Sequence, residues 1–324
     1  MLSRRDCLAL AGAAGVTGFH LNAAHATDAP TVRTPVNFDV PKGACDCHVH
    51  VFPDPAKFPF WSGRVYTPPV ATADDLLALQ HALHMDRVVI VTPSVYGTDN
   101  AATLDGIKAL GPQRARGVAV IGASTTPAEL DAMDKAGIRG IRVNLENGGV
   151  TDPAVAGQRL EAAVGWIKGR PWHIQIYARL SIIAALKPQL AALPVPVVFD
   201  HFAGAKARLG VVQPGFDAVI ELVHSGKAYI KISGAYRISD QPPAYADVAP
   251  LAKALVAANP ERIVWGSDWP HPDPDSAAHR KPTDITQPMV VDDGRVLNLL
   301  PEWVPDAAVR RAILVDNPAR LYQF

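Results

Sequence analysis

Short β-branched segments alternate with Ala/Leu-rich segments from Ala44 onward, and this alternation constrains the fold more than any other feature of the chain. It is typical of parallel βα units rather than of a sandwich or a helical bundle. We expect eight strands, at Cys45 to Val51, Arg87 to Thr92, Gly117 to Ile121, Gly140 to Val143, His173 to Tyr177, Val195 to His201, Ala228 to Ser233 and Arg262 to Ser267. The main helices are expected at Ala73 to His84, Pro127 to Ala136, Pro153 to Lys168, Leu180 to Leu193, Phe216 to Ser225 and Tyr245 to Ala258.

Eight such units in one chain favour an α/β fold of the (β/α)8 TIM-barrel type, as a single domain over residues 44–324. The alternative is an open doubly wound sheet, but no glycine-rich phosphate-binding motif follows any of the expected strands. Two long connections, Phe52 to Ala71 and Trp269 to about Pro301, leave the ends of the first and eighth strands. Barrel active sites lie at these strand ends, so both connections are expected to shape the pocket.

The N-terminus predicts export. Arg4 and Arg5 precede an uncharged Ala/Gly/Leu stretch, and Ala24-His25-Ala26 is an A-x-A cleavage site. This order predicts a signal peptide of the twin-arginine type over residues 1–26, a lead-in segment over residues 27–43 and a periplasmic location. The alternatives are a short buried helix or an uncleaved anchor; after cleavage no stable membrane insertion is expected.

Charge points to a small-molecule partner. The 31 basic and 31 acidic residues balance to a net charge of zero, so no basic footprint for nucleic acid stands out. The sequence does not indicate an oligomeric state. Cys45 and Cys47 lie two apart in an expected strand, where their spacing disfavours a disulfide, and they are predicted to be buried thiols.

Three histidines and one aspartate, His48, His50, His201 and Asp268, are expected at one rim of the barrel. Strand alternation predicts that Asp46, His48 and His50 share a face of the first strand. His201 ends the sixth expected strand, and Asp268 follows the eighth. A lone His-x-His pair is weak, and each residue alone could be a satisfied core or capping group. Their combination at strand ends predicts one shared pocket.

Several motifs together carry a family resemblance: His-x-His at residues 48–50, Asp-His at 200–201, Lys-Ile-Ser-Gly at 231–234, Gly-Ser-Asp-Trp-Pro-His at 266–271 and Asn-Pro at 317–318. The chain resembles the lactonase branch of the amidohydrolase superfamily from Ala44 to Phe324. That resemblance implies that Asp268 is a general base and that His48, His50 and His201 polarise the substrate carbonyl. The four residues would either hold one divalent metal, zinc or manganese, or work without metal.

The resemblance does not extend to a two-metal site. Members with two metals use a lysine or glutamate at the fourth strand and a histidine at the fifth, whereas this chain reads Ile141 to Asn144 and Gln175 to Tyr177 there. Two bound metals are therefore not expected.

Candidate substrate contacts surround these residues. Arg142 and Arg237 are expected to anchor a substrate carboxylate, and Tyr96 and Tyr177 to donate hydroxyl hydrogen bonds. Salt bridges for the arginines and packing for the tyrosines are the alternatives. Lys231 and Ser233 share a face of the seventh strand, with Lys231 as a satisfied interior cation. His271 and His279 lie in the last long connection and are expected to be exposed to solvent.

The resemblance implies hydrolysis of a lactone or related cyclic ester, with Asp268 as base and the three histidines as the electrophilic centre. Dicarboxylate lactonases of this branch carry extra arginines after the fourth and sixth strands, where this chain has Gly148-Gly149 and Phe202-Ala203-Gly204. A monocarboxylate, a neutral sugar lactone or an aromatic-derived lactone is therefore expected. The competing hypotheses are decarboxylation or lactone isomerisation at the same rim, and a non-catalytic periplasmic binding protein.

Overall fold

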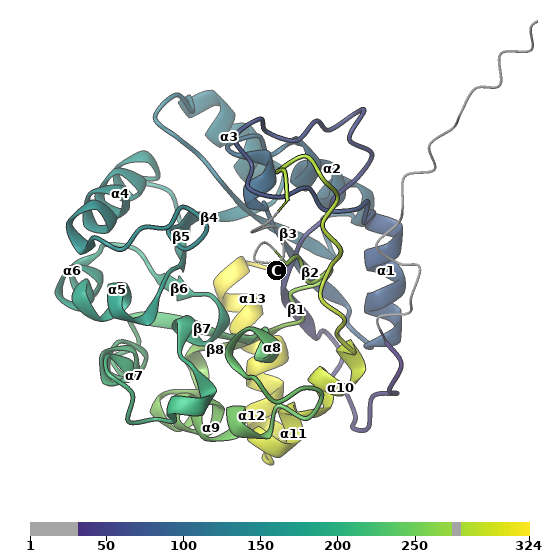
Figure 1. Ribbon diagram of the computed structural model, residues 1–324, viewed down its shortest axis with the longest axis vertical. Helices are drawn as coiled ribbons and strands as arrows, with labels where there is room; N and C mark the ends of the chain where they lie inside the picture. Colours follow the sequence, from purple (N-terminus) through teal and green to yellow (C-terminus); the bar gives the residue numbers. More distant parts are fainter. Residues whose placement is uncertain (1–31, 274–279) are drawn as a thin grey trace, which may run out of the picture.

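The computed structural model describes residues 32–273 and 280–324, which form a barrel of eight parallel strands in the order β1 to β8. The strands lie around a central axis with the helices outside them (Figure 1). Their bounds are β1 Cys45–Val49, β2 Arg87–Val91, β3 Ala115–Ala119, β4 Ile138–Asn144, β5 His173–Tyr177, β6 Val197–Phe199, β7 Ala228–Ser233 and β8 Ile263–Gly266. The α/β barrel predicted from the alternating pattern is confirmed. The signal peptide predicted over residues 1–26 lies outside the described residues.

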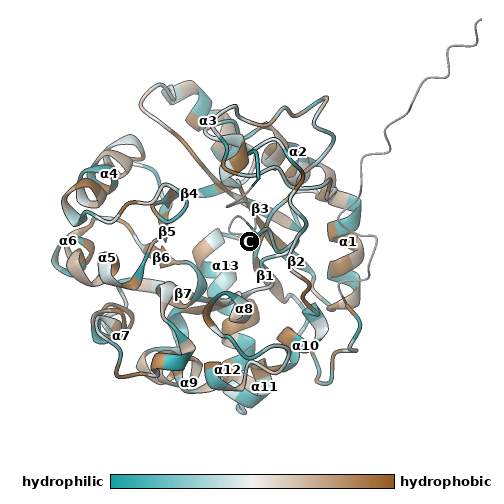
Figure 2. Cartoon of the chain, in the orientation of Figure 1, coloured by the Kyte–Doolittle hydropathy of each residue, from teal (hydrophilic) through white to brown (hydrophobic). Residues whose placement is uncertain are grey.

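The helices follow the strands, and hydrophobic and hydrophilic residues alternate along the outer helices (Figure 2). Thr72 and Thr126 form capping boxes with Asp75 and Glu129, which fix the first residues of the helices that follow them. The bounds are α1 Ala73–Ala82, α2 Ala101–Leu110, α3 Pro127–Lys135, α4 Pro153–Trp166, α5 Leu180–Ala185, α6 Lys187–Ala192, α7 Phe216–His224, α8 Ala235–Ile238, α9 Ala249–Ala258, α10 Asp293–Asn298, α11 Leu300–Trp303, α12 Ala307–Arg311 and α13 Asn317–Tyr322. No helix in the described ranges is both long and apolar enough to cross a bilayer.

The structure corrects several predicted elements. The helix expected from Leu180 to Leu193 is broken into α5 and α6 at Leu186, because Pro188 lies at the start of α6 and has no N–H to continue the helix. Helix α2 is not among the main helices predicted; the side chain of its N-cap residue, Asn100, makes no capping bond and instead bonds Thr92 and the backbone of Val120. The third strand starts two residues earlier than expected, and β6 ends at Phe199, before His201.

The last helix closes the N-terminal end of the barrel. Tyr322 of α13 packs edge-on against His173, the first residue of β5, with 5.3 Å between ring centroids. It shares an apolar cluster with Cys45 and Cys47, which are buried free thiols, as predicted. Figure 1 shows α13 crossing the middle of the barrel. With this end filled, the polar site lies at the opposite, C-terminal end of the strands.

A carboxylate joins the first and last strands. Asp46 Oδ1 accepts hydrogen bonds from the backbone N–H groups of Ser267 (2.9 Å) and His48 (3.2 Å). Further along, the N–H of Asp268 donates to the carbonyl of His48, and the N–H of His50 to that of Trp269, both at 2.8 Å. These bonds bring Asp268 beside the two histidines of β1.

The register of β1 shifts between Asp46 and Val49, so strict alternation fails there. Cys45 and Cys47 pack with the barrel-interior cluster, whereas Val49 and Val51 pack in the larger core that includes the outer helices. The prediction that Asp46 shares one face with both histidines is therefore wrong. Its carboxylate binds backbone N–H groups instead.

Candidate active site

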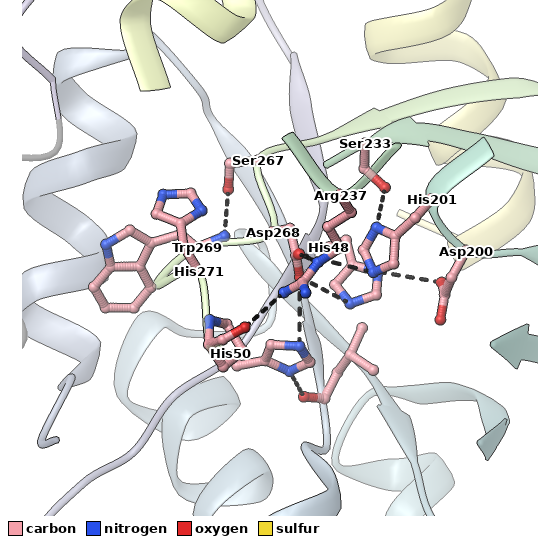
Figure 3. A network of polar contacts seen from close by, with 12 residues as sticks. His48, His50, Asp200, His201, Ser233, Arg237, Ser267, Asp268, Trp269 and His271 are labelled. Carbon is pink, nitrogen blue, oxygen red and sulfur yellow. Dashed lines mark hydrogen bonds and ion pairs between the residues drawn. The ribbon is translucent and has the colours of Figure 1, made fainter. Parts of the chain in front are cut away.

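Three imidazoles surround one carboxylate at the C-terminal end of the barrel (Figure 3). Nε2 of His48 and Nε2 of His50 each lie 3.6 Å from Asp268 Oδ1, and Nε2 of His201 lies 3.8 Å from Asp268 Oδ2. All four side chains are buried. The structure thus brings together the four residues that the sequence places at three separate strand ends.

The backbone is strained where it presents two of these residues. His201 has φ of 46° and Asp268 has φ of 65°, in the left-handed region that non-glycine residues seldom adopt. Strain of this kind persists only where surrounding contacts hold it, and it is concentrated at functional sites. It also explains the early end of β6, because His201 begins a tight turn instead of extending the strand.

Burial keeps the imidazoles neutral. It lowers the pKa of His50 to about 4 and that of His201 to about 4, and it lowers the pKa of His48 well below the ordinary value. Nδ1 of His50 donates to the carbonyl of Val91 at 2.7 Å, so Nε2 carries a lone pair toward Asp268. Nδ1 of His201 lies 2.9 Å from the hydroxyl of Ser233.

His48 has two partners of opposite charge at Nδ1. The Oδ1 atom of Asp200 lies 3.2 Å away and Nζ of Lys231 lies 3.3 Å away. A carboxylate accepts and an ammonium donates, so either neutral tautomer of His48 is supported. When Nδ1 donates to Asp200, Nε2 offers its lone pair to the pocket.

The cluster fits a single metal ion. His48 Nε2 and Asp268 Oδ1 are buried and have no hydrogen-bond partner among the described residues. Separations of 3.6 Å are too long for hydrogen bonds but close to the edge, about 3.4 Å, of a tetrahedron with metal bonds of about 2.1 Å. His48, His50 and Asp268 form one group able to hold an ion, and His48, Asp200 and His201 form another. Nitrogen and oxygen donors of this kind suit a divalent cation such as zinc.

The second oxygen of Asp268 is held from the other side. Oδ2 accepts a hydrogen bond from Tyr236 Oη at 2.7 Å and a short one from Arg237 Nε. Burial alone would raise the pKa of Asp268, but the Arg237 guanidinium, ahead of the three histidines, holds it well below the ordinary value. Arg237, expected to anchor substrate, therefore pairs with the expected base.

One prediction at this site is wrong. His271, expected to be exposed, is 1% exposed. Its Nδ1 lies 3.0 Å from Tyr236 Oη and its Nε2 lies 3.1 Å from Asp293 Oδ2. The loop turns back into the protein, because the His271 N–H donates to the Asp268 carbonyl and the His271 carbonyl accepts from Met289. His279 lies outside the described residues.

A buried ionic network that sequence reasoning missed lies beneath the imidazoles. Asp200 Oδ2 accepts from Arg142 Nε at 3.0 Å and from Gln175 Nε2 at 3.1 Å. Lys231 Nζ donates to Gln175 Oε1 at 2.7 Å and lies 3.5 Å from Asp200 Oδ1, so it is the satisfied interior cation expected. Burial alone would raise the pKa of Asp200, but His48, Arg142 and Lys231 hold it well below the ordinary value. In the sequence, the position of Asp200 directly before His201 was the feature that could have indicated this network.

The two predicted tyrosines differ in their surroundings. Tyr177 packs edge-on against His201, with 5.3 Å between ring centroids, and lies under the Arg142 guanidinium. It lines a small cavity over the site with His50, Asp268 and Arg237. Tyr96 lines an adjoining cavity of about 650 Å³, and its buried hydroxyl has no partner among the described residues.

An eight-stranded βα barrel with a buried histidine and aspartate cluster at its C-terminal end defines an enzyme of the amidohydrolase type. The chain belongs to the amidohydrolase family, whose model matches residues 45–324.

The relatives it resembles include 4-sulfomuconolactone hydrolase of Rhizobium radiobacter, 37% identical over 90% of this chain and 94% of the relative. 2-Pyrone-4,6-dicarboxylate hydrolase of Comamonas testosteroni is 34% identical over 88% of this chain and 92% of the relative. Among solved structures, a putative 2-pyrone-4,6-dicarboxylic acid hydrolase from Pseudomonas putida matches with a TM-score of 0.73 and 30% identity, over 88% of this chain and 98% of that one. The family resemblance predicted from the motifs is confirmed.

Proposed function

We propose that this protein hydrolyses a lactone or a related cyclic ester. The observation that carries the proposal is the ionised, buried Asp268. Its Oδ2 accepts hydrogen bonds from Tyr236 and Arg237, and its Oδ1 has no hydrogen-bond partner among the described residues. Asp268 lines the small cavity over the site, and we propose that Oδ1 accepts a proton from a water molecule bound there. Relatives named as lactone hydrolases at 34% to 37% identity support the same reaction class.

The proposed reaction has two proton transfers. Water attacks the lactone carbonyl carbon, and Asp268 Oδ1 accepts the proton that the water loses as the new C–O bond forms. The ring C–O bond then breaks, and the leaving alkoxide takes that proton, which yields a hydroxy acid and regenerates the carboxylate. Tyr236 stays protonated because burial raises its pKa, so it continues to orient Asp268 as a hydrogen-bond donor.

His48, His50 and Asp268 would hold one divalent cation. We propose His201, whose Nε2 lies 3.8 Å from Asp268 Oδ2, as a further ligand. The charge of the cation would polarise the carbonyl and acidify the attacking water. Arg142 is the proposed anchor for a substrate carboxylate. Its Nε is bound to Asp200, and its side chain lines both the small cavity over the site and the larger cavity beside it. Arg237 is proposed to position Asp268 and to add positive charge at the pocket.

A lactone panel assayed in ¹⁸O-labelled water tests the proposal on protein purified without chelator. Hydrolysis places the label in the hydroxy acid, and Asp268→Asn abolishes it, whereas the exposed Asp240→Asn control does not. Carbon dioxide release or unlabelled isomer would instead indicate decarboxylation or isomerisation. Binding without turnover of any lactone would favour a binding protein.

We further propose that the protein acts in the periplasm after export by the twin-arginine route. Support comes from Arg4, Arg5 and the Ala24-His25-Ala26 cleavage site.

A further inference from the structure

A second cavity adjoins the catalytic cluster. Its volume of about 650 Å³ lies within the range of small-molecule sites. Ser94, Arg142 and Asn147 line both this cavity and the small one over Asp268, so the two lie side by side. The remaining wall comes from residues 59–65 of the first long connection, from the segment after β2, from Val120 after β3, and from Asn144 and Gly148 at the end of β4 and after it.

An aromatic wall is built into this cavity. The backbone N–H of Trp61 donates to the carbonyl of Val95 at 2.8 Å, which ties the connection to the segment after β2. A Cβ at Gly63 would come within 2.4 Å of the indole and one at Gly97 within 3.1 Å. Trp61 is nevertheless 53% exposed, so much of its apolar surface is uncovered. Val65, which lines the same cavity, is 47% exposed, so the two side chains form an uncovered apolar surface beside the active site.

The charges of the cavity limit what it can bind. Arg64 makes its hydrogen bonds within the first long connection. Its Nε donates to Thr67 Oγ1 at 2.7 Å, and a terminal nitrogen donates to the Trp61 carbonyl at 3.1 Å. Asp99 adds a negative charge at the rim. Among the described lining residues, Arg142 is therefore the cation placed to meet a carboxylate, and it lies where the two cavities join.

Tyr96 brings one polar atom to the same cavity. Its side chain lines the cavity and is 3% exposed, yet its hydroxyl has no hydrogen-bond partner among the described residues. A buried hydroxyl without a partner is costly, and a water molecule in the cavity would satisfy it while the Tyr96 ring packs against a bound group.

We propose that this cavity is a substrate subsite for an uncharged, ring-sized apolar group. The substrate class is a lactone or cyclic ester that carries one carboxylate, held by Arg142, and an aromatic or branched alkyl substituent packed between Trp61 and Tyr96. This inference rests on the proposed hydrolase function. It distinguishes the chain from relatives whose names specify substrates with sulfonate or two carboxylate groups.

The test compares two γ-butyrolactones that carry one carboxylate and either a methyl or a phenyl substituent on the ring. Burial of the larger group in a fitting apolar pocket raises kcat/KM for the phenyl compound by about tenfold or more over the methyl compound. Trp61→Ala removes the wall and Val120→Phe fills the cavity, and both bring this ratio close to one. Val155→Ala, an apolar truncation on the outer helix α4, leaves the ratio unchanged.

A ratio near one in the wild type, or a ratio that survives both cavity variants, overturns the subsite. Failure of the hydrolase proposal looks different, because then neither compound nor any other lactone is turned over. In that case calorimetry with 4-phenylbutyrate and butyrate decides the subsite separately. At least tenfold tighter binding of 4-phenylbutyrate, lost in Trp61→Ala, supports it; equal binding overturns it.

Discussion

Mild acid should destabilise the metal-free protein through two buried imidazoles. Burial lowers the pKa of His50 and of His201 to about 4, from an ordinary value of 6.5 in the unfolded chain. Between these values the unfolded chain binds protons that the folded protein does not. The stability that the neutral rings contribute is therefore complete above pH 6.5 and is lost as the pH falls toward 4.

The size of the effect follows from the two pKa values. Between pH 7 and pH 5 each imidazole lowers the free energy of unfolding by about 2 kcal/mol, or about 4 kcal/mol for the pair. Two other buried groups titrate over the same range. The pKa of His173, lowered by burial to about 3, adds about 2 kcal/mol to the loss, and the pKa of Asp46, raised by burial to about 7, offsets about 2 kcal/mol because the folded protein takes up that proton first. Asp200 and Asp268 do not contribute in this range. Their pKa values are held below the ordinary 3.8, so their contribution is lost only at lower pH.

Urea unfolding in the presence of chelator, followed by circular dichroism at both pH values, measures the effect. His50→Gln should reduce the pH-dependent loss by about 2 kcal/mol, because an amide can still donate to the Val91 carbonyl but does not titrate. The exposed His81→Gln serves as the matched control and should keep the full dependence. A wild-type change below about 1 kcal/mol, or full dependence in His50→Gln, would refute the assignment of neutral buried imidazoles.

Four further outcomes are expected. Asp268→Asn should lower kcat by about 10² to 10⁴ with an unchanged far-ultraviolet spectrum, and retained turnover would remove the general base from the mechanism. Tyr236→Phe removes the 2.7 Å hydrogen bond to the Asp268 carboxylate, so the pKa of Asp268 should rise. The acid limb of the kcat/KM profile then moves to higher pH, and an unshifted limb contradicts the contact. Lys231→Met should cost about 3 kcal/mol in urea unfolding, because it leaves a buried carboxylate with one cation fewer. Replacing Arg4 and Arg5 with lysine should leave the precursor in the cytoplasm on fractionation, and normal export would exclude the twin-arginine route.

The convergence of the site could be predicted because the barrel imposes it. Once the strands are assigned, their C-terminal ends meet at one rim, so His48, His201 and Asp268 must approach one another whatever the intervening loops do. Strand periodicity also placed the side chains of Lys231 and Ser233 on the same face of β7.

Contacts between distant loops could not be predicted. Arg142 bonds Asp200, which lies 58 residues later in the sequence. That pairing depends on how far the end of β6 stands along the barrel axis relative to β4. His271 is buried because Asp293, 22 residues later, returns to meet it. The shift in β1 accompanies a contact of the same kind, the hydrogen bond from the backbone N–H of Ser267, just after β8, to the Asp46 carboxylate. None of these leaves a periodic signal in the sequence.

The charges around the imidazoles explain which end of the substrate binds in which part of the pocket. Two ionised carboxylates, Asp200 and Asp268, lie with three cations, Arg142, Lys231 and Arg237, and three minus two leaves one positive charge when the imidazoles are neutral. A bound divalent cation would raise this excess, so in either state the cluster attracts an anion. Buried charge is stabilised only when it is compensated, and the compensation lies at Asp268 and Arg142 rather than beside Trp61. The charged end of the substrate therefore belongs at the imidazole cluster, and its uncharged end belongs in the aromatic-walled cavity.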